Sequence, residues 1–95
     1  MKSNDRPLGD VVKEILRKYK LEDHLEETQM IENWGKTVGS MIAAHTGKLS
    51  VKDHILFVTV DTAALRQELL YRKETLLSLL NKSAGRDIIR DIVFR

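Results

Sequence analysis

The sequence has no cysteine and few aromatic side chains, and these shortages exclude several classes of protein. Its 95 residues include no Cys, one Pro, one Trp, two Tyr and two Phe. Without cysteine the chain has no disulfide framework, no thiol nucleophile and no thiolate metal site. No stretch reaches the roughly 20 apolar residues that span a bilayer. We therefore expect no membrane contact and a cytoplasmic location, because the lack of cysteine fits a reducing compartment.

The length and the balance of residues indicate a folded domain rather than a disordered chain. Hydrophobic residues make up 42% and charged residues 32% of the sequence, which is ordinary for a globular protein. We expect a flexible polar N-terminus over 1–7, with no apolar signal segment, and a single domain over 8–95. The formal net charge of +2 permits a polyanionic partner without requiring one.

Helical periodicity dominates the first half of the chain. Apolar residues spaced by three and four predict a helix over 8–19 that begins after Pro7, and a second helix over 22–38. Gly39 should interrupt the second helix, a short turn over 40–44 should follow, and Gly47 should end the helical structure. Trp34 lies on an apolar helix face and is expected in the core.

The second half predicts a hairpin, a long helix and a last strand. Strands are expected over 48–51 and 55–60, joined by a turn in which Asp53 or His54 takes a left-handed conformation. A long Leu-rich helix, capped by Asp61 or Thr62, should end near Gly85, before a strand over 88–94. A helical crossover makes the last two strands parallel. The predicted class is α+β, with a three-stranded mixed sheet covered by helices on one face and an extra N-terminal helix.

An ordered set of short motifs carries a resemblance over 12–95. The set is Trp34 with Val38-Gly39, His45-Thr46, the alternation Leu56/Val58/Val60, Glu68-Leu69, Leu80-Asn81, Gly85 and Ile92-Val93-Phe94. In this order the chain resembles the DciA family of bacterial proteins. The resemblance implies a KH-like domain in the order helix, strand, strand, helix, strand. It also implies action with the replicative DNA helicase, as its operator or loader, and binding to single-stranded or forked DNA.

The chain departs from the family pattern at three places. Family members typically have a proline after the His-Thr pair and often an aromatic near the start of the long helix, where this sequence has Gly47-Lys48 and Ala63-Ala64. Several members have an extension that engages the helicase, whereas this chain ends at Arg95. Helicase contact is therefore expected from the folded domain or the short N-terminal segment. No Gly-x-x-Gly loop of the kind that clamps RNA in KH domains is present.

Seven basic residues are the candidate nucleic-acid contacts. One group lies along the first predicted helix at spacings of four and three, a second projects between the two Leu stripes of the long helix, and a third follows that helix. The three groups are Lys13, Arg17 and Lys20; Arg66 and Lys73; and Arg86 and Arg90. Arg95 could extend the third group. Each of these residues could instead belong to an ordinary solvated face, with its stem packed and its charge in water.

No catalytic constellation is present. The three histidines, His24, His45 and His54, lack metal-ligand spacing, and no strained nucleophile turn or phosphate-binding glycine loop occurs. We expect neither an enzyme nor a cofactor or metal site. The leading hypothesis is a DNA-replication accessory protein that contacts the replicative helicase and binds single-stranded or forked DNA weakly. The alternatives are a protein-interaction module, using Leu70, Leu77 or the edge strand, and an RNA-binding module.

Overall fold

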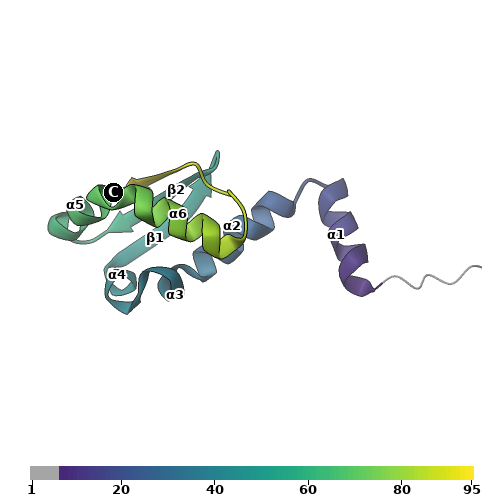
Figure 1. Ribbon diagram of the computed structural model, residues 1–95, viewed down its shortest axis with the longest axis horizontal. Coiled ribbons are helices and arrows are strands. Elements are labelled where there is room, and N and C mark those ends of the chain that lie inside the picture. The colour runs from purple at the N-terminus through teal and green to yellow at the C-terminus, as the bar shows by residue number, and fades with distance from the viewer. Residues whose placement is uncertain (1–6) are drawn as a thin grey trace, which may run out of the picture.

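The computed structural model describes residues 7–95, so most of the N-terminus that was expected to be flexible lies outside the described residues. Along the described chain, a group of helices comes first, followed by a pair of strands, two further helices and a last strand (Figure 1). The elements are α1 (Leu8–Lys18), α2 (Glu22–Glu32), α3 (Trp34–Val38), α4 (Ser40–Ala44), β1 (Thr46–Lys52), β2 (Ile55–Val60), α5 (Ala63–Tyr71), α6 (Lys73–Ala84) and β3 (Asp91–Phe94). The α+β class predicted from the sequence is confirmed.

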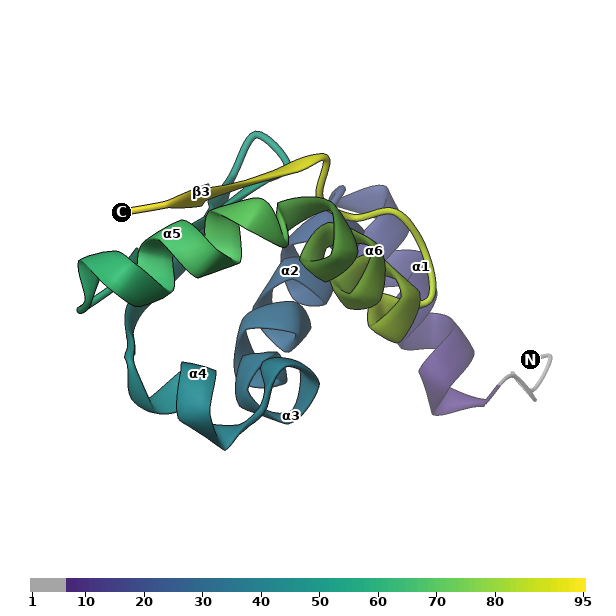
Figure 2. The ribbon, with the colours of Figure 1, turned by 60° about the vertical axis from the view of Figure 1, so that its left-hand side comes forward.

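The three strands form one mixed sheet in the order β1-β2-β3. β1 and β2 are antiparallel, and β2 and β3 are parallel, which confirms the predicted crossover. Phe57 of β2 lies opposite Ser50 of β1 and Val93 of β3. α2, α5 and α6 contact the sheet. Figure 2 shows α5 and α6 together on one side of β3.

The β1–β2 turn has the left-handed backbone that its residues predicted. Asp53 and His54 have φ values of 53° and 62°. Two successive residues with positive φ match the twist of a tight hairpin, and short polar side chains tolerate this region better than branched ones. The His54 ring nitrogen Nδ1 lies 3.0 Å from the carbonyl oxygen of Ile88, so the turn is tied to the segment that leads into β3.

The core lies between the sheet and the helices. Alternate residues of β2 point into it, namely Leu56, Val58 and Val60. The helices and the segment before β3 add Met30, Trp34, Leu69, Leu76, Leu80, Ile88, Ile89 and Ile92. Trp34 is 3% exposed, which confirms its predicted core position. Its indole Nε1 donates to the Thr46 hydroxyl at 3.0 Å.

Both long predicted helices are interrupted, and that part of the prediction is wrong. The helix expected over 22–38 breaks at Asn33, and the long Leu-rich helix breaks at Arg72. At both residues φ is near −95° and ψ is near 0°, which changes the helix direction without a glycine or proline. The break lets α5 pack on β2 and β3 while α6 also packs against α2 and α3. Figure 2 shows α5 and α6 running in different directions.

Two further boundaries differ from the predictions. Gly47 does not end a helix but lies inside β1, where the pairing register with β2 shifts between Thr46 and Leu49. The third strand begins at Asp91 rather than at residue 88, because the backbone of Ile88 and Ile89 bonds to the Asn81 side chain instead of to β2. Thr62 caps α5 by accepting from the Leu65 amide at 3.1 Å, and Gly85 closes α6 with a φ of 89°, as predicted.

The amphipathic helix α1 packs on α2 but buries none of its residues. Leu8 is 78% exposed and Ile15 is 49% exposed. Lys20 ends the helix in a left-handed conformation, with a φ of 58°, and the Leu21 amide donates to the Leu16 carbonyl at 2.8 Å. This turn directs α1 away from the sheet (Figure 1). The apolar face of the helix is consequently left in solvent.

Candidate nucleic-acid interface

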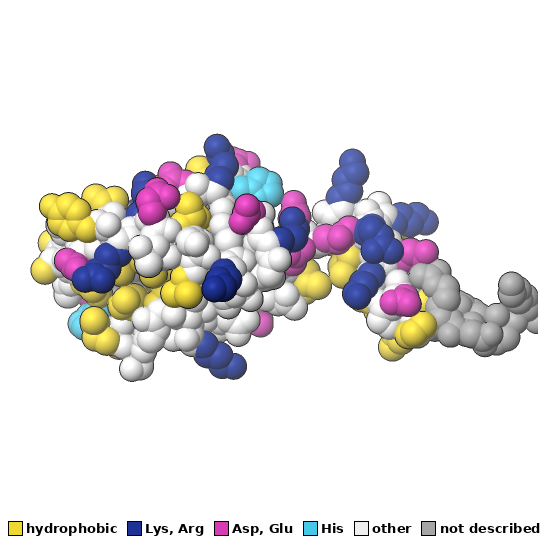
Figure 3. Space-filling view, viewed as in Figure 1, with side chains coloured by type: hydrophobic (Ala, Val, Ile, Leu, Met, Phe, Trp, Pro, Cys, Tyr) yellow, Lys and Arg dark blue, Asp and Glu magenta, His cyan; other side chains and the backbone are white. Residues whose placement is uncertain are grey.

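The three basic residues predicted on the first helix are exposed in the structure. Lys13, Arg17 and Lys20 form no ion pair with another described residue, so their charges are available to a ligand. Figure 3 shows Lys and Arg side chains clustered on α1, beside hydrophobic side chains of the same helix. Two free cations on α1 and a third just after its end are the type of feature that phosphate groups neutralise.

The structure brings a further predicted residue to this end of the molecule. Arg17 and Lys20 line an open hollow at the α1–α2 junction together with Arg86, which follows α6. The hollow also contains Glu22 and Asp23 from the start of α2. Cations and carboxylates thus alternate around it, and the net field there is weaker than the basic residues alone would produce.

Arg86 is held by two carboxylates and is not free. Its Nε and Nη2 donate to the Glu26 carboxylate at 2.7 and 2.8 Å, and Nη2 also donates to Asp23 Oδ1 at 2.6 Å. These hydrogen bonds, chiefly those with Glu26, raise the pKa of Arg86 above its ordinary value. Because Nε and Nη2 are bonded to these carboxylates, Arg86 fastens the α6–β3 connection to α2, and its charge is balanced locally.

Lys73 is also paired, in this case with the first residue of β3. Its Nζ lies 3.1 Å from Asp91 Oδ1. The hydrogen bond from Lys73, followed by one from the Ile92 amide, lowers the pKa of the Asp91 carboxyl below its usual range. Asp91 therefore stays ionised and keeps Lys73 engaged throughout the neutral range. Sequence reasoning missed this pairing because the two residues belong to different elements.

Arg66 and Arg90 bond to backbone carbonyls. Arg66 Nη2 donates to the Val60 carbonyl at 2.9 Å, and its Nε is buried with no partner among the described residues. Arg90 Nε donates to the Asp53 carbonyl at 3.2 Å, at the hairpin turn. Neither residue lines the hollow at the α1–α2 junction, and neither does Lys73. The seven predicted basic residues therefore do not form one surface.

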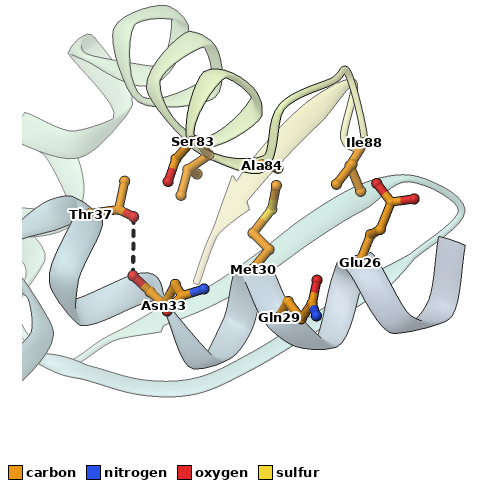
Figure 4. A pocket seen from close by; sticks show the side chains of 9 residues that line it. Glu26, Gln29, Met30, Asn33, Thr37, Ser83, Ala84 and Ile88 are labelled. Atoms are coloured by element: carbon orange, nitrogen blue, oxygen red, sulfur yellow. Dashed lines mark hydrogen bonds between the residues drawn. The ribbon is translucent and has the colours of Figure 1, made fainter. Parts of the chain in front are cut away.

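A narrow cleft separates α2 from the end of α6, as Figure 4 shows. Its apolar part consists of Met30, Leu80 and Ile88, and polar side chains such as Asn33 and Thr37 line the remainder. The cleft measures about 110 Å³, well below the several hundred Å³ of a typical ligand or cofactor pocket. Glu26, its one carboxylate, is already bonded to Arg86. This cleft does not have the arrangement of a catalytic centre.

The side chains of His45 and His54 have structural partners. His45 Nδ1 lies 2.9 Å from Asp61 Oδ1, a pair that links the end of α4 to the start of α5 and that sequence spacing did not indicate. Among residues 7–95, no group of three His, Asp or Glu side chains is placed to hold a metal ion. In the same range, no helix combines the length and apolar character needed to cross a bilayer.

A family comparison adds to this geometry. The family model described as "Dna[CI] antecedent, DciA" matches residues 7–94, nearly the whole chain. The chain belongs to the DciA family. Membership in this family supports a role related to DNA replication.

Curated relatives of this DciA-family chain are distant in sequence. A UPF0232 protein of Mycobacterium marinum is 23% identical over 87 residues, covering 92% of this chain and 46% of the relative. A UPF0232 protein of Corynebacterium glutamicum is 33% identical over 60 residues, covering 63% of this chain and 34% of the relative. The chain therefore spans less than half the length of these relatives. No solved structure matches the chain significantly.

Proposed function

We propose that this chain is a DNA-replication accessory domain that contacts the replicative DNA helicase and binds single-stranded or forked DNA weakly through basic helix faces. The family match over 7–94 is the observation that carries this proposal. The helix α1 supports it, because it combines uncovered apolar side chains with free cations. A domain that links a protein to DNA needs both kinds of surface.

The apolar side of α1 is the proposed helicase contact. Leu8, Val12 and Ile15 are between 45% and 78% exposed, and they recur at the spacing of one helix face. An amphipathic helix that lays its apolar face into a groove of a partner is a common recognition mode. Tyr19, 63% exposed, extends the same region toward α2. The basic side of the helix would remain available for DNA.

Helicase contact is tested by co-elution. We expect the chain to co-elute with the replicative helicase of the same genome in size exclusion with light scattering. Replacing Val12 and Ile15 by serine should weaken the complex at least tenfold, since buried apolar anchors dominate interfaces. The matched control replaces Leu70 and Met41 by serine and should leave co-elution unchanged. These two side chains are 49% and 62% exposed and lie on other helices. Absence of a complex with the unmodified chain, with and without nucleotide, would remove helicase contact from the proposal.

DNA contact by α1 is tested by the salt dependence of binding. Replacing Lys13 and Arg17 by alanine should lower the slope of log affinity against log salt by about 1.4 for single strands, at roughly 0.7 per lost phosphate contact. The matched control is alanine at Lys36 and Lys82, which are exposed and unpaired among the described residues but lie on other helices. Equal slopes in the two double variants would show that α1 does not contact phosphates. Arg66 is unsuited to this test because its guanidinium is partly buried.

A further inference from the structure

The sheet has a second face that no helix of residues 7–95 covers. Residues that alternate with the core positions point to it, and in Figure 2 α5 and α6 lie together on the other side of β3. On β2 this open face carries Ile55, Phe57 and Thr59, which contrast with the buried Leu56, Val58 and Val60. Ser50 and Val93 flank Phe57 in register on the neighbouring strands. Phe57 is therefore the central side chain of this face.

An arginine stacks on this aromatic ring. The guanidinium carbon of Arg95 lies 4.5 Å from the centre of the Phe57 ring, within the range of a cation–π contact. Arg95 is exposed, and no described carboxylate pairs with it. Phe57 is half-buried, and Arg95 lies against its ring. A nucleobase that takes the place of the guanidinium can stack on the ring, while the displaced arginine contacts a phosphate.

Free lysines follow the edge of the same sheet. Lys48 and Lys52 are exposed on the edge strand β1, and neither forms an ion pair with another described residue. Lys52 is in register with Ile55, which is in turn opposite Asp91 of β3. The negative charge of Asp91 is compensated by Lys73 at 3.1 Å. Arg95, Lys48 and Lys52 thus give this part of the surface a positive balance around an aromatic centre.

We infer that the open face of the sheet is a stacking platform for single-stranded nucleic acid, with Phe57 under a base and Arg95, Lys48 and Lys52 near the backbone. The platform is separate from the cations of α1. It shares with the proposed function only the premise that the chain binds single strands. One aromatic accommodates one base, so the expected binding is weak and tolerant of sequence.

The charge and the small apolar area of this face favour single-stranded nucleic acid over a protein as its ligand. A protein that packed on this face by apolar contact would need a larger apolar patch than Phe57, Ile55 and Val93 supply. A duplex would offer phosphates to the lysines, but its bases are stacked on one another and cannot reach the ring. A single strand can contact both the aromatic ring and the lysines, because its unstacked bases and its phosphates are accessible at the same time.

The test measures binding of a fluorescein-labelled oligothymidylate of about 12 nucleotides by anisotropy at several salt concentrations. Phe57→Leu should weaken binding about tenfold, because it removes a stacking contact. The salt slope should stay unchanged, because no phosphate contact is removed. Phe57→Tyr should retain the affinity. The double replacement of Lys48 and Lys52 by alanine should instead lower the slope by about 1.4. Phe57→Leu should also lose the preference for the single strand over a duplex of equal length.

The controls separate this platform from the α1 surface. Tyr71 is the most exposed aromatic, at 78%, and lies on α5, so Tyr71→Leu should leave binding unchanged. If Phe57→Leu does not fold, Arg95→Gln tests the platform at an exposed position, and it should weaken binding and lower the salt slope by about 0.7. An unaltered affinity in Phe57→Leu, together with a lowered slope in the Lys13 and Arg17 variant, overturns the platform and leaves the proposed function intact. Absence of any single-strand binding by the unmodified chain overturns the platform and the DNA-binding part of the proposed function, whereas helicase contact is decided by co-elution.

Discussion

Replacing Trp34 by alanine is expected to lower the free energy of unfolding by about 3–5 kcal/mol. The indole is 3% exposed and packs where α3 meets β1. Its Nε1 donates to the Thr46 hydroxyl, which in turn donates to the Ile42 carbonyl at 2.8 Å. Removing the ring leaves a cavity and a broken hydrogen-bond chain. The total stability of a domain of this size is about 5–15 kcal/mol, so the loss is a large share.

Urea unfolding followed by circular dichroism measures this effect, because the variant has no tryptophan to report by fluorescence. Trp34→Phe should cost about 1–2 kcal/mol, since it keeps much of the packing and loses the hydrogen bond. The matched surface control is Tyr71→Ala, for which a change within about 0.5 kcal/mol is expected. A loss below about 1 kcal/mol in Trp34→Ala would contradict the central position of the indole in the core.

Local chemistry made several parts of the fold predictable from the sequence. The alternation Leu56, Val58 and Val60 identified a half-buried strand, because side chains on a strand repeat with a period of two. Thr62 and Gly85 marked the two ends of the α5–α6 crossover through side-chain capping and a left-handed φ. Each of these signals depends on residues close together in the chain.

The helix breaks could not be predicted in the same way. Neither Asn33 nor Arg72 is a proline or glycine, and helical periodicity continues through both positions. The interruptions follow from packing, because α5 and α6 lie against different neighbours. Helical periodicity likewise predicted an apolar face on α1 but could not say whether anything covers it. In the structure that face is exposed.

The candidate site was predictable only in part for a related reason. A sequence pattern locates cations but not the groups that neutralise them. Arg86 and Asp23 are 63 residues apart, and Lys73 and Asp91 belong to a helix and a strand. The stacking of Arg95 on Phe57 also joins a residue of β2 to the residue that follows β3. Which basic residues remain free for a ligand is therefore a property of the tertiary structure.

Replacing Asn81 by alanine is the other change with a large expected effect, about 3 kcal/mol of unfolding free energy. Asn81 is 8% exposed. Its Oδ1 accepts from the amides of Ile88 and Ile89 at 2.9 and 3.1 Å, and its Nδ2 donates to the Ile89 carbonyl at 2.8 Å. The Asn81 side chain thus supplies to Ile88 and Ile89 the backbone hydrogen bonds that a neighbouring strand would otherwise supply. Alanine would leave three backbone groups without partners beside a buried cluster, at about 1 kcal/mol or more each.

Urea unfolding gives the magnitude, and amide hydrogen exchange shows where the loss occurs. The amides of Ile88 and Ile89 should lose protection before those of β2, because the removed bonds hold only the segment that leads into β3. The neighbouring exposed replacement Lys82→Ala should change stability by less than about 0.5 kcal/mol. Since Asp91, Val93 and Arg95 follow this segment, loosening it should also weaken single-strand binding if the open sheet face is the platform. Full protection of Ile88 and Ile89 in the variant would mean that the core alone positions β3.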